Sequence, residues 1–240
     1  MKIDIWSDYA CPFCYIGKRR LENALSQFPH RDQVEVVFRS FQLDPNAKVH
    51  GNRDIHDMLA SKYGMTREKA VAMNEQLAEQ ARGVGLDFRF DTMMPTNTFD
   101  SHRLTHYASK QGKAAEMTER LLRAYFTDSV NLGEHSVLVS LAAEIGLNEK
   151  ETLEMLESDA YADEVNGDIE EGQRLGITGV PFFVFNNKYA ISGAQPGPVF
   201  TEVLDTVWAE EQSGPSLQLV GTDAAKASTD DGCSDGSCDI

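Results

Sequence analysis

A short apolar strand that leads directly into a pair of cysteines is the feature that most constrains this 240-residue chain. Residues 3–6 read Ile-Asp-Ile-Trp, and a turn separates them from Cys11 and Cys14. Pro12 suits the first turn of a helix, where its missing N–H costs nothing. From Tyr15 onward, apolar residues recur at helical spacing. The stretch therefore predicts a strand, a turn and a helix, with Cys11 at the helix N-terminus.

The two cysteines are predicted to differ in reactivity. Unpaired N–H groups and the helix dipole favour a thiolate at Cys11. Cys14 lies one turn further along, so we expect it to be more buried and to resolve a mixed disulfide formed by Cys11. A zinc knuckle or two inert core thiols would fit the same spacing, but no two further zinc ligands stand nearby in the sequence. We expect redox chemistry and no metal.

The charge balance limits the partners of the chain. Lys and Arg number 22 and Asp and Glu number 38, which gives a net charge of −16. This excess of negative charge disfavours nucleic acids and anionic membrane surfaces. We see no apolar stretch of membrane-spanning length and no secretory signal before the first strand, so we expect a cytoplasmic location. A monomer and a homodimer both remain open.

The order of the expected elements indicates an α/β fold. Strands are expected at 34–38, 182–185 and 188–192, and Asn186-Asn187 suits a hairpin turn. Helical spacing occurs over the ranges 55–63, 66–84, 98–111, 114–127, 136–145, 152–175 and 199–211. In the range 152–175 we expect a buried stripe of Tyr161, Val165, Ile169 and Leu175. The order is thus βαβ, a helical insert and ββα.

Two separated motifs carry a resemblance to a known family. Cys-Pro-Phe-Cys at 11–14 follows the first strand, and Val-Pro at 180–181 precedes a later one. Together with Trp-Ser-Asp at 6–8, Phe-Gln-Leu at 41–43 and the stretches 97–103 and 176–183, they resemble the DsbA-like branch of the thioredoxin superfamily. Within that branch the chain looks like the FrnE-type cytoplasmic dithiol-disulfide oxidoreductases. These are relatives of 2-hydroxychromene-2-carboxylate isomerase and kappa-class glutathione transferase.

The resemblance implies a domain organisation. It predicts a thioredoxin fold with an inserted all-helical domain. The expected boundaries are a discontinuous thioredoxin-like domain at 1–43 and 165–211, the helical insert at 44–164, and an acidic flexible tail at 212–240.

The resemblance also implies the roles of the site residues. Cys11, Cys14 and Pro181 would be the catalytic positions, and the Val180–Pro181 bond is expected to be cis. A cis-proline loop would leave the Val180 backbone free to pair with an extended substrate. The residues expected to contact substrate are Pro12, Phe13, Asn97, His102 and Val180. Because Phe13 replaces a histidine of the family prototype, we expect a less oxidising couple than the prototype.

Three functions remain to be weighed. The first is a thiol-disulfide oxidoreductase or isomerase that exchanges disulfides with protein or small thiols. The second is glutathione-dependent transfer or isomerisation of small molecules, but the related enzymes carry a serine where Cys11 stands. The third is a redox-independent holdase chaperone. Retention of both thiols favours the first, with no cofactor except glutathione as a possible co-substrate.

Two further groups of residues were candidates for chemistry. Cys233 and Cys238 form a Cys-x4-Cys pair in the acidic tail, and they suit a secondary redox pair that shuttles electrons, a quiet disulfide or, less well, a metal site. His102 and His106 lie four apart on an expected helix, a spacing that can hold zinc. The intervening residues lack the glutamate of the zinc protease motif, so we interpret them as residues of a helix face.

Overall fold

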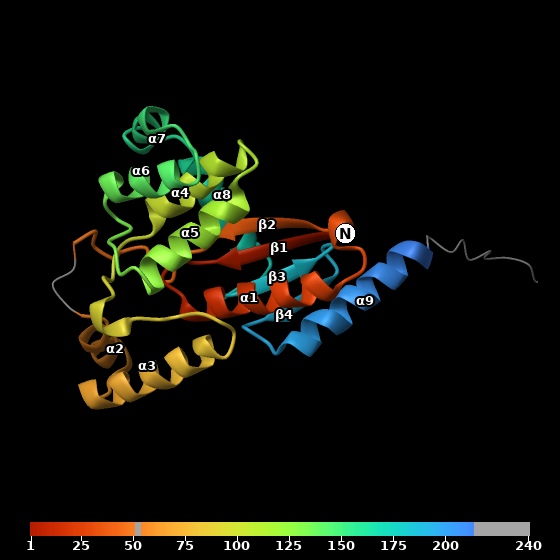
Figure 1. The fold of residues 1–240 in the computed structure, drawn as a ribbon, viewed down its shortest axis with the longest axis horizontal. Helices are drawn as coiled ribbons and strands as arrows, with labels where there is room; N and C mark the ends of the chain where they lie inside the picture. Colours follow the sequence, from red (N-terminus) through yellow and green to blue (C-terminus); the bar gives the residue numbers. More distant parts are fainter. Residues whose placement is uncertain (51–53, 214–240) are drawn as a thin grey trace, which may run out of the picture.

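A mixed sheet organises the computed structural model, which describes residues 1–50 and 54–213 (Figure 1). Within these residues its four strands run in the spatial order β2-β1-β3-β4. β1 pairs in parallel with β2 and antiparallel with β3, and β3 pairs antiparallel with β4. The strands are β1 (Lys2–Ser7), β2 (Glu35–Ser40), β3 (Phe182–Phe185) and β4 (Tyr189–Ser192). The parallel β1–β2 pair is the βαβ start that the sequence predicts.

Two helices pack together along one face of the sheet. They are α1 (Pro12–Gln27) and α9 (Gly197–Ser213), which lie side by side in Figure 1. Alternate side chains of β1, Ile3 and Ile5, are buried in the core on this face, because successive strand residues point to opposite faces. Phe183, Phe200 and Leu204 complete this core, and all three are fully buried.

The helices between β2 and β3 form a second core. It includes Leu104, Leu121 and Phe126, which are fully buried, and Tyr15 and Ile16 of α1 join it. The elements of this part of the chain are α2 (Ile55–Tyr63), α3 (Arg67–Arg82), α4 (Phe99–Ser109), α5 (Ala114–Phe126), α6 (His135–Glu144), α7 (Glu149–Leu156) and α8 (Ala162–Arg174). The predicted fold class, a thioredoxin fold with an inserted helical region, is confirmed. The domain boundaries at 43/44 and 164/165 stay predictions.

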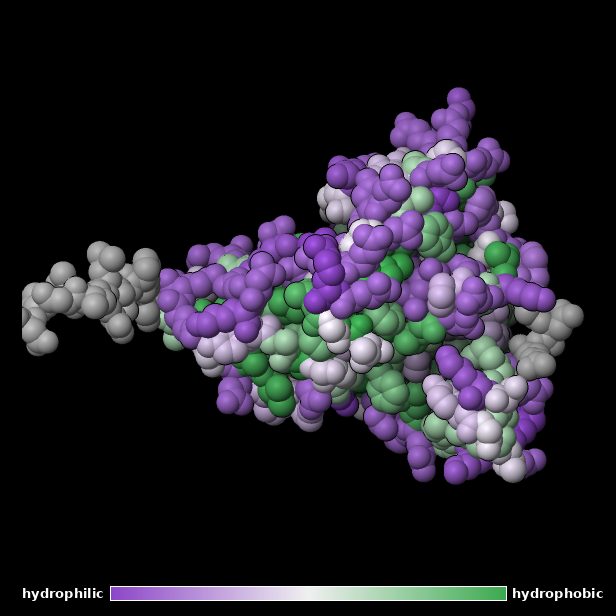
Figure 2. Space-filling model, turned by 180° about the vertical axis from the view of Figure 1, so that it is seen from behind, coloured by the Kyte–Doolittle hydropathy of each residue, from purple (hydrophilic) through white to green (hydrophobic). Residues whose placement is uncertain are grey.

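The surface is largely polar. Figure 2 shows hydrophilic side chains over much of the visible face, with hydrophobic residues among them toward its middle. Of the helices in residues 1–50 and 54–213, none combines the length and the apolar composition that crossing a bilayer requires.

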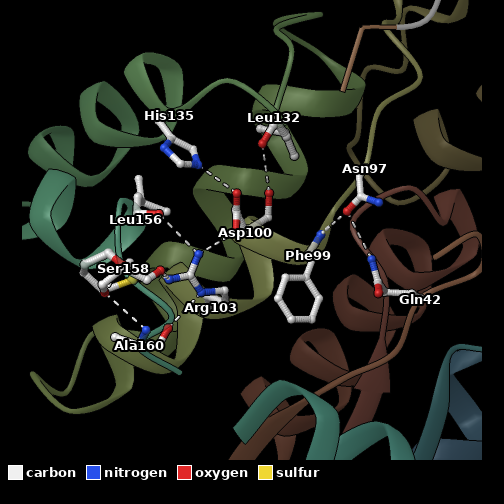
Figure 3. Close-up of polar contacts among 12 residues, drawn as sticks. Gln42, Asn97, Phe99, Asp100, Arg103, Leu132, His135, Leu156, Ser158 and Ala160 are labelled. Atoms are coloured by element: carbon white, nitrogen blue, oxygen red, sulfur yellow. Dashed lines mark hydrogen bonds and ion pairs between the residues drawn. The ribbon is translucent and has the colours of Figure 1, made fainter. Parts of the chain in front are cut away.

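The prediction of one helix over 152–175 with a buried stripe is wrong, both in the continuity of the helix and in the residues of the stripe. The chain breaks between α7 and α8, where Tyr161 adopts a left-handed backbone with φ of 65°. The Arg103 guanidinium stabilises this break by donating to backbone carbonyls (Figure 3); the carbonyls are those of Met155, Leu156, Ser158 and Ala160. Leu175 is 55% exposed, so it does not belong to a buried stripe.

The buried face of α8 differs from the expected one for a packing reason. Val165, Asp168 and Gly172 are its buried residues. The Trp6 indole N–H donates to the Asp168 carbonyl at 2.9 Å, and a Cβ on Gly172 would lie only 2.9 Å from that indole nitrogen. A glycine is therefore needed where the Trp6 ring lies against the helix.

Candidate functional site

The Cys-x-x-Cys pair lies where β1 passes into α1. Cys11 is the N-cap residue of α1, and its N–H donates to the Asp8 carbonyl at 3.1 Å. The Cys14 N–H donates to the Cys11 carbonyl at 3.0 Å. Both cysteines are free thiols and both are buried, with 4% of Cys11 and 2% of Cys14 exposed. Between them, Pro12 is half-buried and Phe13 is 45% exposed.

The Val180–Pro181 segment lies directly against Cys11. Its peptide bond is cis, as expected. The Cys11 thiol donates to the Val180 carbonyl at 3.5 Å, although 169 positions separate the two residues in the chain. The Pro181 carbonyl accepts from the Gly193 N–H at 2.8 Å, which ties the loop to the end of β4. The fold therefore brings together the two motifs that carried the resemblance.

The surroundings of Cys14 disfavour ionisation of its thiol. Burial raises the pKa of Cys14 well above its ordinary value, and the hydrogen bond and charge of Cys11 raise it further. Hydrogen bonds from the Asp8 backbone and the Ser7 side chain act in the opposite direction but do not cancel this effect. The Cys14 side chain accordingly holds its proton in the reduced protein.

Asp8 is a buried carboxylate beneath the cysteine loop. Its Oδ2 accepts from the Leu43 N–H at 2.7 Å, and its Oδ1 accepts from the Ala10 N–H at 3.4 Å. Burial alone would raise the pKa of Asp8. The neighbouring His102 side chain, together with the Leu43 N–H and the Thr98 side chain, nevertheless holds that pKa below its usual value of 3.8. Sequence reasoning gave Asp8 no role of its own, although the Trp-Ser-Asp stretch at 6–8 was part of the family resemblance.

His102 lies next to this carboxylate. Its side chain is buried, its Nε2 is 3.5 Å from Asp8 Oδ1, and its ring centroid is 4.8 Å from that of Tyr9. His106, one turn along α4, binds elsewhere: its Nε2 is 2.9 Å from Asp168 Oδ2. The two histidines thus have different partners. In the described part of the chain, His, Cys, Asp and Glu side chains form no group of three that could hold a metal ion.

Asn97 joins a loop to the start of α4. Its Oδ1 accepts from the Phe99 N–H at 2.9 Å and from Gln42 Nε2 at 3.3 Å (Figure 3). Its Nδ2 donates to the carbonyls of Pro45 and Ala47 at 3.1 and 3.0 Å. These bonds position the chain segment after β2. Substrate contact by Asn97 and His102 stays a prediction, and Cys233 and Cys238 lie outside the described residues.

Known proteins resemble this chain in sequence and in fold. A crystal structure of a probable DsbA oxidoreductase from Streptomyces coelicolor is 43% identical to the chain, with a TM-score of 0.85. The match covers 93% of this chain and 95% of that one. A curated relative, the uncharacterized protein YwbO of Bacillus subtilis (strain 168), is 28% identical over 204 residues, which span 84% of this chain and 94% of the relative.

More distant structures share the fold. A 2-hydroxychromene-2-carboxylate isomerase, 13% identical, matches with a TM-score of 0.66 and covers 89% of this chain and 98% of its own. The family model of the DSBA-like thioredoxin domain matches residues 2–205. This match over most of the chain, in a fold that places two buried thiols at the start of α1 beside a cis-proline loop, shows that the chain belongs to the DSBA-like thioredoxin domain family.

Proposed function

We propose that the chain is a FrnE-type thiol-disulfide oxidoreductase or isomerase that acts through Cys11 and Cys14. The observation that carries this proposal is the position of Cys11. Its sulfur lies at the N-terminus of α1, with the Val180 carbonyl of the cis-proline loop 3.5 Å away and Cys14 one turn along the helix. The 43% identity to a probable DsbA oxidoreductase supports the same reaction class.

The proposed reaction has two exchange steps. The Cys11 thiolate attacks one sulfur of a substrate disulfide, so a Cys11–substrate disulfide forms and the other substrate sulfur leaves as a thiolate. Cys14 then loses its proton and attacks the Cys11 sulfur. The Cys11–Cys14 disulfide forms, and the second substrate sulfur leaves with the electron pair of the broken bond. The substrate disulfide is reduced and the enzyme dithiol is oxidised; the reverse sequence oxidises a substrate dithiol.

Residues around the pair suit an extended substrate. Phe13 offers an exposed apolar side chain next to the sulfurs. Pairing of a substrate backbone with Val180 would place its cysteine close to Cys11. We propose protein or small-molecule thiols as substrates, glutathione as a possible co-substrate, and a cytoplasmic location. Electron transfer to or from Cys233 and Cys238 is part of this proposal, and it requires a separate test.

Reduction of insulin disulfides by dithiothreitol tests the proposal. We would compare the wild type, Cys11→Ser and the double variant Cys233→Ser/Cys238→Ser. Loss of activity in Cys11→Ser alone supports the dithiol mechanism and excludes a role for the tail pair in this reaction. Loss in both variants makes the tail pair part of the relay. If the wild type does not accelerate the reaction, the proposal is wrong for protein disulfides.

A further inference from the structure

The backbone that follows β4 supports the cis-proline loop. The Gly193 N–H donates to the Pro181 carbonyl at 2.8 Å, and Gly193 has a left-handed backbone with φ of 76°. The Gln195 N–H donates to the Gly193 carbonyl at 3.0 Å, and Gln195 Nε2 donates to the Ser192 carbonyl at 2.9 Å. The position of the Pro181 carbonyl therefore depends on the path of residues 193–195, which we call the support segment.

Arg20 of α1 binds the support segment. Its Nη1 donates to the carbonyl of Ala194 and, at 3.4 Å, to the carbonyl of Gln195. Arg20 is half-buried, and within the described part of the chain it forms no ion pair, although Glu202 and Asp205 line the same groove between α1 and α9. Its hydrogen bonds there go to main-chain carbonyls alone. Because a charged donor makes stronger hydrogen bonds than a neutral one, Arg20 holds this backbone in place.

The same face of α1 packs directly on the cis-proline loop. Gly17 lies one helical turn before Arg20, so the two residues share a face of the helix. A Cβ on Gly17 would lie 3.0 Å from Pro181 Cγ and 3.5 Å from Ala194 Cα. Cys11 is the N-cap residue of this helix. The contacts of Gly17 and Arg20 therefore fix the position of the cis-proline loop relative to the Cys11 sulfur.

We propose that Arg20 is a positioning residue for substrate binding. By binding the support segment, Arg20 keeps the Gly193 N–H against the Pro181 carbonyl. It thereby keeps the Val180 backbone in the orientation that pairs with an extended substrate. Arg20 acts through the backbone and takes no part in the exchange between sulfurs. This inference rests on the proposed function, and it adds a residue that belongs to neither of the two sequence motifs of the site.

Two matched substrates separate substrate binding from the reaction at sulfur. The first is an extended peptide whose one cysteine is disulfide-linked to β-mercaptoethanol. The second is hydroxyethyl disulfide, which has the same leaving thiol but no peptide backbone that could pair with Val180. Reduced protein is mixed with an excess of either substrate and quenched in acid, and mass spectrometry measures formation of the Cys11–Cys14 disulfide over time. The dependence of this rate on substrate concentration gives the half-saturating concentration.

In Arg20→Met we expect the half-saturating concentration of the peptide disulfide to rise about tenfold, because the variant loses the orientation of a binding group and keeps the reacting sulfurs. The rate constant with hydroxyethyl disulfide should stay at the wild-type value. The matched control is Lys188→Met, which removes the ion pair between Lys188 Nζ and Glu210 at 2.6 Å. This pair also ties the β3–β4 hairpin to α9, but at the end of the hairpin away from Pro181. Neither constant should change in the control.

An unchanged half-saturating concentration of the peptide in Arg20→Met would overturn the inference. Equal slowing with both substrates would also overturn it, because that result indicates general damage to the site. If circular dichroism shows that Arg20→Met does not fold, Arg20→Lys takes its place. A lysine side chain is shorter and lacks the planar donor group, so we expect a smaller rise with the peptide alone; no rise would again overturn the inference. If the wild type reacts with neither disulfide, the proposed function itself fails.

Discussion

Gly17 is the residue of α1 that lies against the cis-proline loop, and its replacement tests how closely the helix packs on that loop. A Cβ at this position would lie 3.0 Å from Pro181 Cγ and 3.1 Å from Phe183 Cζ, both on rigid rings. Gly167 provides the matched control, because it is an exposed helical residue of α8 whose added Cβ would meet no atom within 4 Å. The two Gly→Ala substitutions therefore differ mainly in this contact.

The expected difference follows from two opposing effects. Alanine in place of glycine stabilises a helix interior by about 1 kcal/mol, and this gain applies to both positions. Overpacking of a close-packed core costs about 1–3 kcal/mol, and this cost applies only to Gly17→Ala. We expect Gly167→Ala to be more stable than the wild type by about 1 kcal/mol. Gly17→Ala should lie about 1–3 kcal/mol below Gly167→Ala.

Urea unfolding and thermal melts measure the two variants. For a chain of this size, 1 kcal/mol corresponds to about 2–4 °C in Tm. Insulin reduction is measured in parallel, and we expect Gly17→Ala to lose about two- to tenfold in activity because a shift of Pro181 displaces the substrate relative to Cys11. If Gly17→Ala is stabilised as much as Gly167→Ala and keeps full activity, the close packing of α1 against the loop is refuted.

Three other perturbations have clear expected outcomes. Asp8→Asn should lower the free energy of unfolding at neutral pH. Because the folded-state pKa of Asp8 lies below 3.8, the difference from the wild type should persist above about pH 3.8 and disappear as the pH falls further. Urea unfolding measured from pH 3 to pH 7 would show this dependence. Arg103→Met should lower the free energy of unfolding by about 3–5 kcal/mol, because it leaves the carbonyls at the α7–α8 break unpaired. The control Arg67→Met removes an exposed ion pair and should lower the free energy of unfolding far less in the same assay. Phe13→Ser removes an exposed apolar side chain, so it should raise KM for insulin and leave the rate with oxidised glutathione unchanged. If the reactions with insulin and with oxidised glutathione slow equally, an apolar contact of Phe13 with protein substrates is contradicted.

Much of the fold was predictable because its signals are local. The helix at 55–63 and the strand at 182–185 have the predicted bounds, and the other predicted elements, apart from the helix over 152–175, differ by a few residues at their ends. Asp54 and Gly64 are the N-cap and C-cap residues of the helix at 55–63, so the local sequence marks both its start and its end. Cys11 at the start of α1 follows from the same kind of signal, a strand, a turn and a proline in the first turn.

The break between α7 and α8 was not predictable in this way. The stretch 152–175 contains glycines only at 167 and 172, inside α8, and no proline. The local signal is limited to Ser158 and Asp159, whose side chain and backbone accept from the Ala160 and Ala162 N–H groups. The turn is stabilised in addition by Arg103, which lies more than fifty positions earlier and satisfies the carbonyls that the helix end leaves unpaired.

The sequence by itself determined the order of the elements, the place of the two thiols at a helix start, and, through the family resemblance, the cis bond before Pro181. Only the tertiary structure decided that Cys11 contacts Val180, that Asp8 is buried beside His102, and that Arg103 binds the carbonyls at the break between α7 and α8. The physical reason is the range of the interactions. Periodicity and capping act over a few residues, whereas burial and hydrogen bonding of these side chains depend on segments that meet only when β1, α4 and α5 pack together.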